Sequence, residues 1–219
     1  MKIDLDVEVL ADNNTAAKYN RDLFEKKKTL VINLMSSPGA GKTTLLEKTV
    51  AALGSDYRIG VIEGDLATEK DADRIRAYGA QAVQINTNGG CHLDARMIAK
   101  VLPQFDFDDI DILFIENVGN LVCPSGYDLG QNHKVAILSV PEGNDKIPKY
   151  PVMFRRTEMV ILNKIDLLPY LDFDVDMAIE DLKGINPESQ LIQVSSRTGE
   201  GLDVWLSWIK QAYIQNQER

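Results

Sequence analysis

A short apolar run that leads through a glycine-rich turn into a helical pattern constrains the fold of this chain more than any other feature. The run spans residues 29–35, the turn at 36–43 reads Ser-Ser-Pro-Gly-Ala-Gly-Lys-Thr, and the helical pattern spans 44–53. A strand, such a turn and a helix in this order are the context that a phosphate-binding P-loop requires. The usual motif begins with glycine, where this chain has Ser36, but its Gly-Lys-Thr end is intact.

The residue types of this turn suit the binding of a nucleoside triphosphate. Backbone N–H groups at the start of a helix hold phosphate oxygens, and glycine lets the main chain come close without a Cβ in the way. The lysine of such a loop reaches the β- and γ-phosphates, so Lys42 is a predicted catalytic residue, and the hydroxyl of Thr43 is placed to bind Mg²⁺. The predicted phosphate-binding residues are Ser37, Pro38, Gly39, Ala40, Gly41, Lys42, Thr43 and Thr44.

Further apolar runs follow along the chain, and helical patterns lie between most of them. Runs rich in β-branched residues are typical of strands that are buried on both faces of a parallel sheet. Strands that alternate with helices predict an α/β fold of three layers with a mostly parallel sheet, here of the P-loop NTPase type. The runs lie at 30–34, 59–62, 82–85, 112–115, 135–140, 159–162 and 191–194, and the helical patterns include 68–78, 92–102, 173–183 and 202–215.

The charge balance argues against a general nucleic-acid-binding protein. The formal net charge is −9, whereas a nucleic-acid-binding surface requires clustered basic side chains. No apolar stretch reaches the ~18 residues of a membrane-spanning helix, and the first residues lack the apolar core of a signal peptide. We therefore expect a cytoplasmic protein with no nucleic-acid or membrane partner, whose two cysteines are free or metal-bound rather than bridged.

A second motif predicts which base the site accepts. Residues 163–166, Asn-Lys-Ile-Asp, directly follow the apolar run at 159–162. The Asp166 carboxylate can accept hydrogen bonds from the N1–H and 2-amino groups of guanine, which adenine lacks, and paired bonds of this kind reject the wrong partner by roughly 10⁴–10⁵. We expect Asn163 to brace this loop and the Lys164 stem to cover the base. Ser195 and Ser196 begin a loop whose backbone N–H can contact the guanine O6, so GTP and GDP are the predicted nucleotides.

Two acidic residues follow the runs at 59–62 and 112–115. Asp65 and Glu116 therefore lie at the carboxyl ends of expected strands, where open α/β sheets bind their ligands. We predict that Asp65 binds Mg²⁺ or orients the attacking water, and that Glu116 acts in the same way from the neighbouring strand. Gly119 can offer an unobstructed N–H to the γ-phosphate. A helix cap or a surface charge remains the alternative for either acid, and no glutamine is obviously placed to orient water.

Cys91, His92 and Cys123 form a candidate metal site. The first two open the helical pattern at 92–102, and a cysteine at a helix N-terminus tends toward the thiolate. Thiolate and imidazole together suit Zn²⁺ or Ni²⁺. The spacing is not that of a zinc ribbon, so two buried structural cysteines remain an alternative. A full coordination shell would need a second chain or solvent. We expect His133 to be a surface or core histidine rather than a metal ligand.

The chain divides into two predicted parts. Residues 1–28 are an N-terminal extension with a helix, for which Asn13, Asn14 and Thr15 are plausible N-terminal caps. Residues 29–219 are a P-loop GTPase domain that includes the metal site.

Taken together, these segments resemble the HypB family, the hydrogenase nickel-incorporation GTPases. The family is one of P-loop GTPases that form homodimers with nucleotide and help to deliver nickel to the large subunit of [NiFe] hydrogenase, together with a small zinc-containing partner, HypA. The resemblance implies that Cys91, His92 and Cys123 bind nickel or zinc at a dimer interface. It is carried by residues 36–43, 63–68, 89–95, 116–124 and 163–169.

The resemblance leaves several alternatives open. Some family members carry a cysteine motif or a histidine-rich tract near the N-terminus, and this sequence has neither, so N-terminal nickel storage is not expected. The urease nickel GTPase typically has Cys-Pro-His where this chain has the adjacent Cys91-His92. A regulatory GTPase without metal would tolerate loss of Cys91 and Cys123, and a small-molecule kinase would leave 163–166 unexplained. A nickel-binding protein that is not an enzyme would need more histidine and cysteine, and the ligand types do not separate nickel from zinc.

Overall fold

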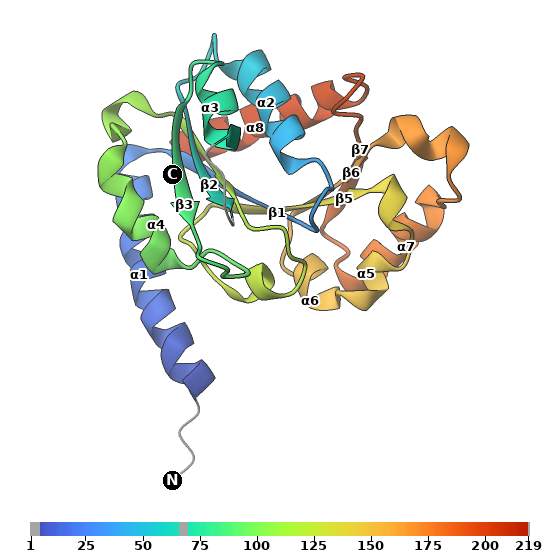
Figure 1. Ribbon diagram of the computed structural model, residues 1–219, viewed down its shortest axis with the longest axis horizontal. Helices are drawn as coiled ribbons and strands as arrows, with labels where there is room; N and C mark the ends of the chain where they lie inside the picture. The colour runs from blue at the N-terminus through green and yellow to red at the C-terminus, as the bar shows by residue number, and fades with distance from the viewer. Residues whose placement is uncertain (1–4, 66–69, 219) are drawn as a thin grey trace.

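In the part of the chain that the structure describes, seven strands form a parallel sheet with helices on both faces (Figure 1). The structure is a computed structural model that describes the backbone of residues 5–65 and 70–218 and the side chains of residues 10–64 and 73–218. The strand order is β3-β2-β4-β1-β5-β6-β7, and every neighbouring pair is parallel. The predicted three-layer α/β fold with a parallel sheet is therefore confirmed.

The central strands are apolar because helices cover both of their faces. Every residue of β1 is buried, as is every residue of β4 and β6, and such strands read as continuous hydrophobic runs. Each strand lies within a few residues of the run that predicted it. The strands are β1 (Leu30–Ser36), β2 (Ile59–Asp65), β3 (Gln81–Asn86), β4 (Ile112–Glu116), β5 (His133–Ser139), β6 (Met159–Asn163) and β7 (Gln190–Gln193).

The helices fall into two layers. On one face of the sheet, side chains of α2, α3 and α8 pack in a core cluster with alternate residues of the strands. Two clusters lie on the opposite face (Figure 1), one with side chains of α1 and α4. The other contains side chains of α5, α6 and α7. The Trp205 indole N–H on α8 donates to Thr49 Oγ1 on α2 at 2.9 Å. The helices are α1 (Leu5–Lys27), α2 (Lys42–Leu53), α3 (Lys70–Arg76), α4 (Ala95–Val101), α5 (Lys146–Lys149), α6 (Pro151–Phe154), α7 (Val175–Ile185) and α8 (Leu202–Gln217).

The N-terminal helix begins earlier than the sequence indicated. Helix α1 starts at Leu5, so Asn13, Asn14 and Thr15 lie inside it and do not cap it. Asn13 is instead buried, and its Nδ2 donates to the Asp128 carbonyl at 2.9 Å while its Oδ1 accepts from the Ala95 N–H at 2.8 Å. The asparagine therefore fastens α1 to the start of α4 through tertiary hydrogen bonds.

This arrangement predicts opposite effects for two adjacent asparagines. Asn13→Ala should lower the free energy of unfolding by about 2 kcal/mol, because it leaves buried backbone groups without partners. Asn14 is exposed, so Asn14→Ala should raise the free energy of unfolding by about 0.5 kcal/mol through helix propensity. Urea denaturation of the two variants measures both, and equal changes would contradict the tertiary role of Asn13.

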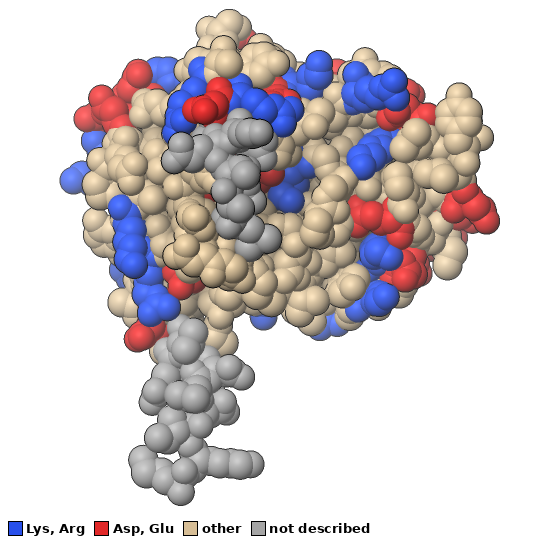
Figure 2. All heavy atoms as spheres, in the orientation of Figure 1, with Lys and Arg blue, Asp and Glu red and all other residues tan. Residues whose placement is uncertain are grey.

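The surface displayed in Figure 2 carries charged side chains of both signs. On the face that Figure 2 displays, acidic and basic side chains are interspersed among the described residues, without a continuous basic surface. In the described part of the chain, no helix combines the length and the apolar character that crossing a membrane requires.

Candidate functional site

The P-loop joins the carboxyl end of β1 to the start of α2. Gly41 has φ 96° at the N-cap of α2, and a Cβ there would lie 2.4 Å from Asn163 Nδ2. Only glycine fits this position, since it tolerates positive φ and adds no atom. Lys42 Nζ donates to Ser36 Oγ at 2.8 Å, so the serine that departs from the usual motif is a partner of the lysine.

A cavity of about 280 Å³ lies beside the P-loop, on the side of β6 and β7. Asn163 organises its wall, because its Nδ2 donates to the Ala40 carbonyl at 2.9 Å and its Oδ1 accepts from the Ser196 N–H at 3.0 Å. The cavity brings together most residues of the predicted guanine site with two residues of the P-loop. Its lining residues are Gly41, Thr44, Asn163, Lys164, Asp166, Leu167, Ser196 and Arg197.

Two of the predicted base-site residues also make side-chain contacts that the sequence did not indicate. Ser195 Oγ donates to Asp166 Oδ1 at 2.7 Å, so Ser195 orients the carboxylate. Lys164 has φ 61°, and its Nζ donates to the Gly39 carbonyl at 2.6 Å. Both side chains therefore hold parts of the site in position. Leu167 and Arg197 also line the cavity, although neither was among the predicted site residues.

The acids at the strand ends lie next to the P-loop. Thr43 Oγ1 donates to Glu116 Oε1 at 2.8 Å, and Glu116 lies opposite Glu63 in the register of β2 with β4. The strand β2 ends at Asp65, but the side chain of Asp65 lies outside the described residues. Gly119 packs against the P-loop, because a Cβ there would lie 3.0 Å from Pro38 Cα.

Glu142 is a further neighbour of the phosphate loop that the sequence did not indicate. It accepts a hydrogen bond from Ser37 Oγ, and its other oxygen caps the turn after β5 through Ser139. The pattern Ser-x-x-Glu at 139–142 is a capping box, which was the available sequence signal.

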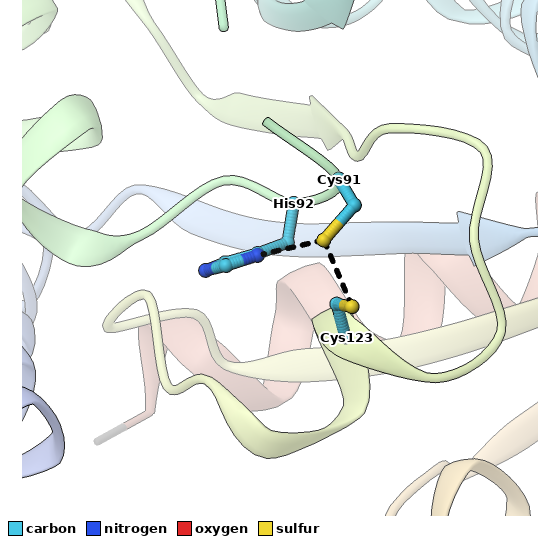
Figure 3. A group of neighbouring side chains, drawn as sticks. All are labelled: Cys91, His92 and Cys123. Atoms are coloured by element: carbon cyan, nitrogen blue, oxygen red, sulfur yellow. Dashed lines mark hydrogen bonds between the residues drawn. The ribbon is translucent and has the colours of Figure 1, made fainter. Parts of the chain in front are cut away.

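Cys91, His92 and Cys123 lie together, as Figure 3 shows. The Sγ atoms of Cys91 and Cys123 are 2.9 Å apart, and Cys91 Sγ lies 3.6 Å from His92 Nδ1. The ligand atoms all lie within 4.8 Å of one another, the one such group of three or more His, Cys, Asp or Glu among the described side chains. Cys91 is exposed and both cysteines are free, so the alternative of two buried structural cysteines is wrong.

Comparison with known proteins identifies the family. The family described as "CobW/HypB/UreG, nucleotide-binding domain" matches residues 30–193. The hydrogenase maturation factor HypB of Escherichia coli (strain K12) is 53% identical over 208 residues, which cover 95% of this chain and 72% of that protein. The chain belongs to the HypB family.

Solved structures of HypB proteins share the fold. The crystal structure of HypB from Helicobacter pylori in complex with nickel matches this chain with a TM-score of 0.88 and 40% sequence identity. The match covers 94% of this chain and 96% of the Helicobacter pylori chain. The structure of HypB from Archaeoglobus fulgidus also matches with a TM-score of 0.88, at 38% sequence identity. That match covers 93% of this chain and 100% of the Archaeoglobus fulgidus chain. The signal recognition particle receptor FtsY of Elizabethkingia anophelis, at 14% identity and a TM-score of 0.54, shares the fold alone.

In this HypB-family chain, helix α4 begins three residues later than the predicted helix at 92–102. The helix begins at Ala95, with Asp94 as its N-cap through a 2.8 Å hydrogen bond from the Met97 N–H, so Cys91 and His92 precede the helix. The predicted thiolate at a helix N-terminus is therefore wrong. The hydrogen bond with Cys123, and then burial, raise the pKa of Cys91, so a metal ion would have to displace the thiol proton in order to bind there.

The surroundings of His92 favour its neutral imidazole form. Burial lowers its pKa, and its ring stacks on Tyr127 with the centroids 4.0 Å apart. A neutral imidazole is the form that binds metals. His133 lies elsewhere, on β5, where its ring meets Trp208 edge-on at 5.1 Å.

The P-loop glycines of this HypB-family chain provide a matched pair of variants. Gly39 has φ 76°, and a methyl group added there would have no atom within 4 Å, whereas a methyl group on Gly41 would meet Asn163. In the absence of nucleotide, Gly39→Ala should cost about 1–2 kcal/mol of stability through backbone strain alone. Gly41→Ala should cost about 1–3 kcal/mol more through overpacking. Urea denaturation separates the two, and equal losses would contradict the close contact with Asn163.

Proposed function

We propose that this chain is a GTPase that uses the state of its nucleotide to bind and release a metal ion, nickel or zinc, during hydrogenase maturation. One observation carries the proposal. The segment 116–123 begins at Glu116, which accepts a hydrogen bond from Thr43 of the P-loop, and ends at Cys123 in the metal-ligand group. A change at the phosphates therefore has a short covalent path to a metal ligand.

The phosphate side of the site fits a magnesium ion. Mg²⁺ prefers hard oxygen ligands, and the hydroxyl of Thr43 lies within hydrogen-bonding distance of the carboxylate of Glu116. We assign Thr43 and Asp65 as the residues that hold Mg²⁺, which would neutralise charge on the phosphate oxygens. Lys42 stabilises the charge that develops on the γ-phosphate, and Asp65 or Glu116 orients the attacking water.

The base is assigned as guanine. Asp166 lines the cavity beside the P-loop, and Ser195 orients its carboxylate. Asn163, Lys164 and Ser196 hold the walls of the same cavity, and Gly119 approaches the phosphate loop. GTP and GDP are therefore the nucleotides of the proposal.

The metal cargo is assigned to Cys91, His92 and Cys123. The ligand types accept Ni²⁺ and Zn²⁺, and the HypB of Helicobacter pylori has been crystallised with nickel. One chain offers three ligand atoms in this group, so we propose that a second copy of the chain or solvent completes the shell. The partners of the proposal are a HypA-type zinc-containing nickel chaperone and the large subunit of a hydrogenase, in the cytoplasm.

Nucleotide and metal then control each other. Binding of GTP orders the ends of β2 and β4, favours the homodimer and tightens the metal site, and hydrolysis loosens it so that the ion passes to a partner. Because coupling is reciprocal, a metal that binds more tightly with GTP must tighten GTP binding by the same factor.

The test is a titration of the purified chain with Ni²⁺ and Zn²⁺, in GDP and in a non-hydrolysable GTP analogue, with mass followed by light scattering. We expect a nucleotide-dependent metal affinity, a shift to dimer with the analogue, and release of phosphate from GTP. Equal metal affinity in both nucleotide states would refute the gating, and no metal binding in either state would leave a regulatory GTPase.

A further inference from the structure

Asn117 joins the two loops that carry the metal ligands. It lies directly after β4 and is 1% exposed. Its Oδ1 accepts from the Leu93 N–H at 3.1 Å and from the Val118 N–H at 3.0 Å. Leu93 follows His92, and Val118 begins the segment that leads to Cys123. A single carbonyl oxygen therefore fixes both loops in relation to each other.

The same asparagine is anchored to the strand that precedes the P-loop. Its backbone N–H donates to the Leu34 carbonyl at 2.9 Å, and its Nδ2 donates to Asn33 Oδ1 at 3.3 Å. The amide cannot be reversed without losing both bonds that its Oδ1 accepts, since an NH₂ group only donates. The position of Asn117 Oδ1 therefore depends on β1 and on Glu116. Glu116 directly precedes Asn117 in the chain and accepts a hydrogen bond from Thr43 of the P-loop.

Leu93 provides a second connection between the sites. Its side chain is fully buried and packs against Gly64 of β2, where an added Cβ would lie 2.8 Å from Leu93 Cγ. Gly64 stands between Glu63 and Asp65 at the carboxyl end of β2. The residue that follows His92 is therefore held from the ends of β2 and of β4, the two strand ends that carry Asp65 and Glu116.

We propose that Asn117 is the positioning residue that couples the nucleotide to the metal. The proposal rests on the proposed function and names the part of the chain that performs the coupling. A shift of Glu116 when the nucleotide changes would move Asn117, its neighbour, and with it the acceptor that both ligand-bearing loops share. Because closely packed interiors transmit small displacements, the spacing of Cys91, His92 and Cys123 follows the nucleotide.

The test compares metal affinity in the two nucleotide states for the intact chain and for Asn117→Ala. The measured quantity is the ratio of the Ni²⁺ affinity with the GTP analogue to the Ni²⁺ affinity with GDP. For the wild type we expect a ratio of about 5–150, the usual range of coupling between two sites. In Asn117→Ala the ratio should fall to near unity, while GDP binding to the metal-free protein is retained. A purely structural role would lower thermal stability and leave the ratio unchanged, and that result would overturn the proposal.

Asn120→Ala is the matched control. Asn120 lies in the same segment, and its Oδ1 accepts only the nearby Val122 N–H, at 2.8 Å, among the hydrogen bonds of the described residues. This variant should keep the wild-type ratio. If it loses the ratio as fully as Asn117→Ala does, the coupling belongs to the whole segment and the assignment to Asn117 is wrong.

A second variant covers the case in which Asn117→Ala does not fold. Asn33→Val removes the side-chain oxygen that accepts from Asn117 Nδ2 and orients its amide. The Nδ2 of Asn33 itself has no hydrogen-bond partner among the described residues, so β1 should tolerate the change. We expect a ratio between those of the wild type and unity, and an unchanged ratio would overturn the proposal. A wild-type ratio of unity would instead refute the proposed function, so the two failures are distinguishable.

Discussion

Replacing Cys123 with alanine should lower the affinity of this chain for Ni²⁺ by at least ~100-fold and leave GDP affinity unchanged. Loss of a residue that only supports a metal ligand typically costs 10–100-fold in affinity, and loss of a thiolate ligand itself should reach or exceed ~100-fold. The loss should be severe because Cys123 Sγ lies 2.9 Å from Cys91 Sγ, so one ion can contact both sulfurs. Competition with a chromophoric chelator measures the metal affinity, and fluorescence of a labelled GDP measures the nucleotide affinity.

Val122→Ala is the control for this experiment. Val122 adjoins Cys123 and is 60% exposed, so its truncation should leave metal affinity within a few-fold of the wild type. The double variant of Cys91 and Cys123 should lose little more than either single variant, because ligands of one ion act as a unit and their effects are not additive. Nickel affinity that survives loss of Cys123 would place the ion elsewhere in the chain.

Replacing Asp166 with asparagine should lower GTP affinity by about 10⁴-fold, the scale on which paired hydrogen bonds discriminate. The amide would present N–H groups toward the donors of guanine, and it would no longer accept from both of them. Xanthine has a carbonyl where guanine has its 2-amino group, so xanthosine nucleotides should become the preferred ligands. Direct titration of the wild type and the variant with fluorescently labelled GTP and labelled XTP measures the switch.

Asp172→Asn controls for the change of charge. Asp172 lies in the same region of the chain and is exposed, and it does not line the cavity that contains Asp166. This variant should bind GTP as the wild type does. An Asp166→Asn variant that keeps its preference for GTP would show that guanine is not bound in the cavity beside Asn163.

The strands were predictable from the sequence because strands that are buried on both faces consist of consecutive hydrophobic residues. Val31 and Ile32 face opposite layers of helices and are both fully buried, so the run reads as uninterrupted hydrophobic residues. The P-loop and the Asn-Lys-Ile-Asp motif were visible for a related reason, since each is a local turn whose residue types follow from its backbone and its ligand.

The features that the sequence did not reveal depend on contacts between distant segments. Asn13 has the residue type of a helix cap, but its partners are the backbones of Ala95 and Asp128, which no local pattern records. Asp94 displaces the start of α4 because its side chain provides the N-cap. Asn117 lies in the segment 116–124 that carries the family resemblance, but nothing in that segment indicates its role, which follows only from the proximity of Leu93, Val118 and Asn33.

The pocket beside the P-loop is built from both halves of the chain, and this has a consequence for its synthesis. Asn163 fastens the P-loop to the loop at Ser196, and Trp205 fastens α8 to α2. Chains emerge from the ribosome with the N-terminus first, so Cys91 and Cys123 are made well before the residues that close the cavity. A growing chain therefore carries its thiols before it can form this cavity, and the proposed control of the metal by GTP can begin only after Asn163 and Ser196 have been made.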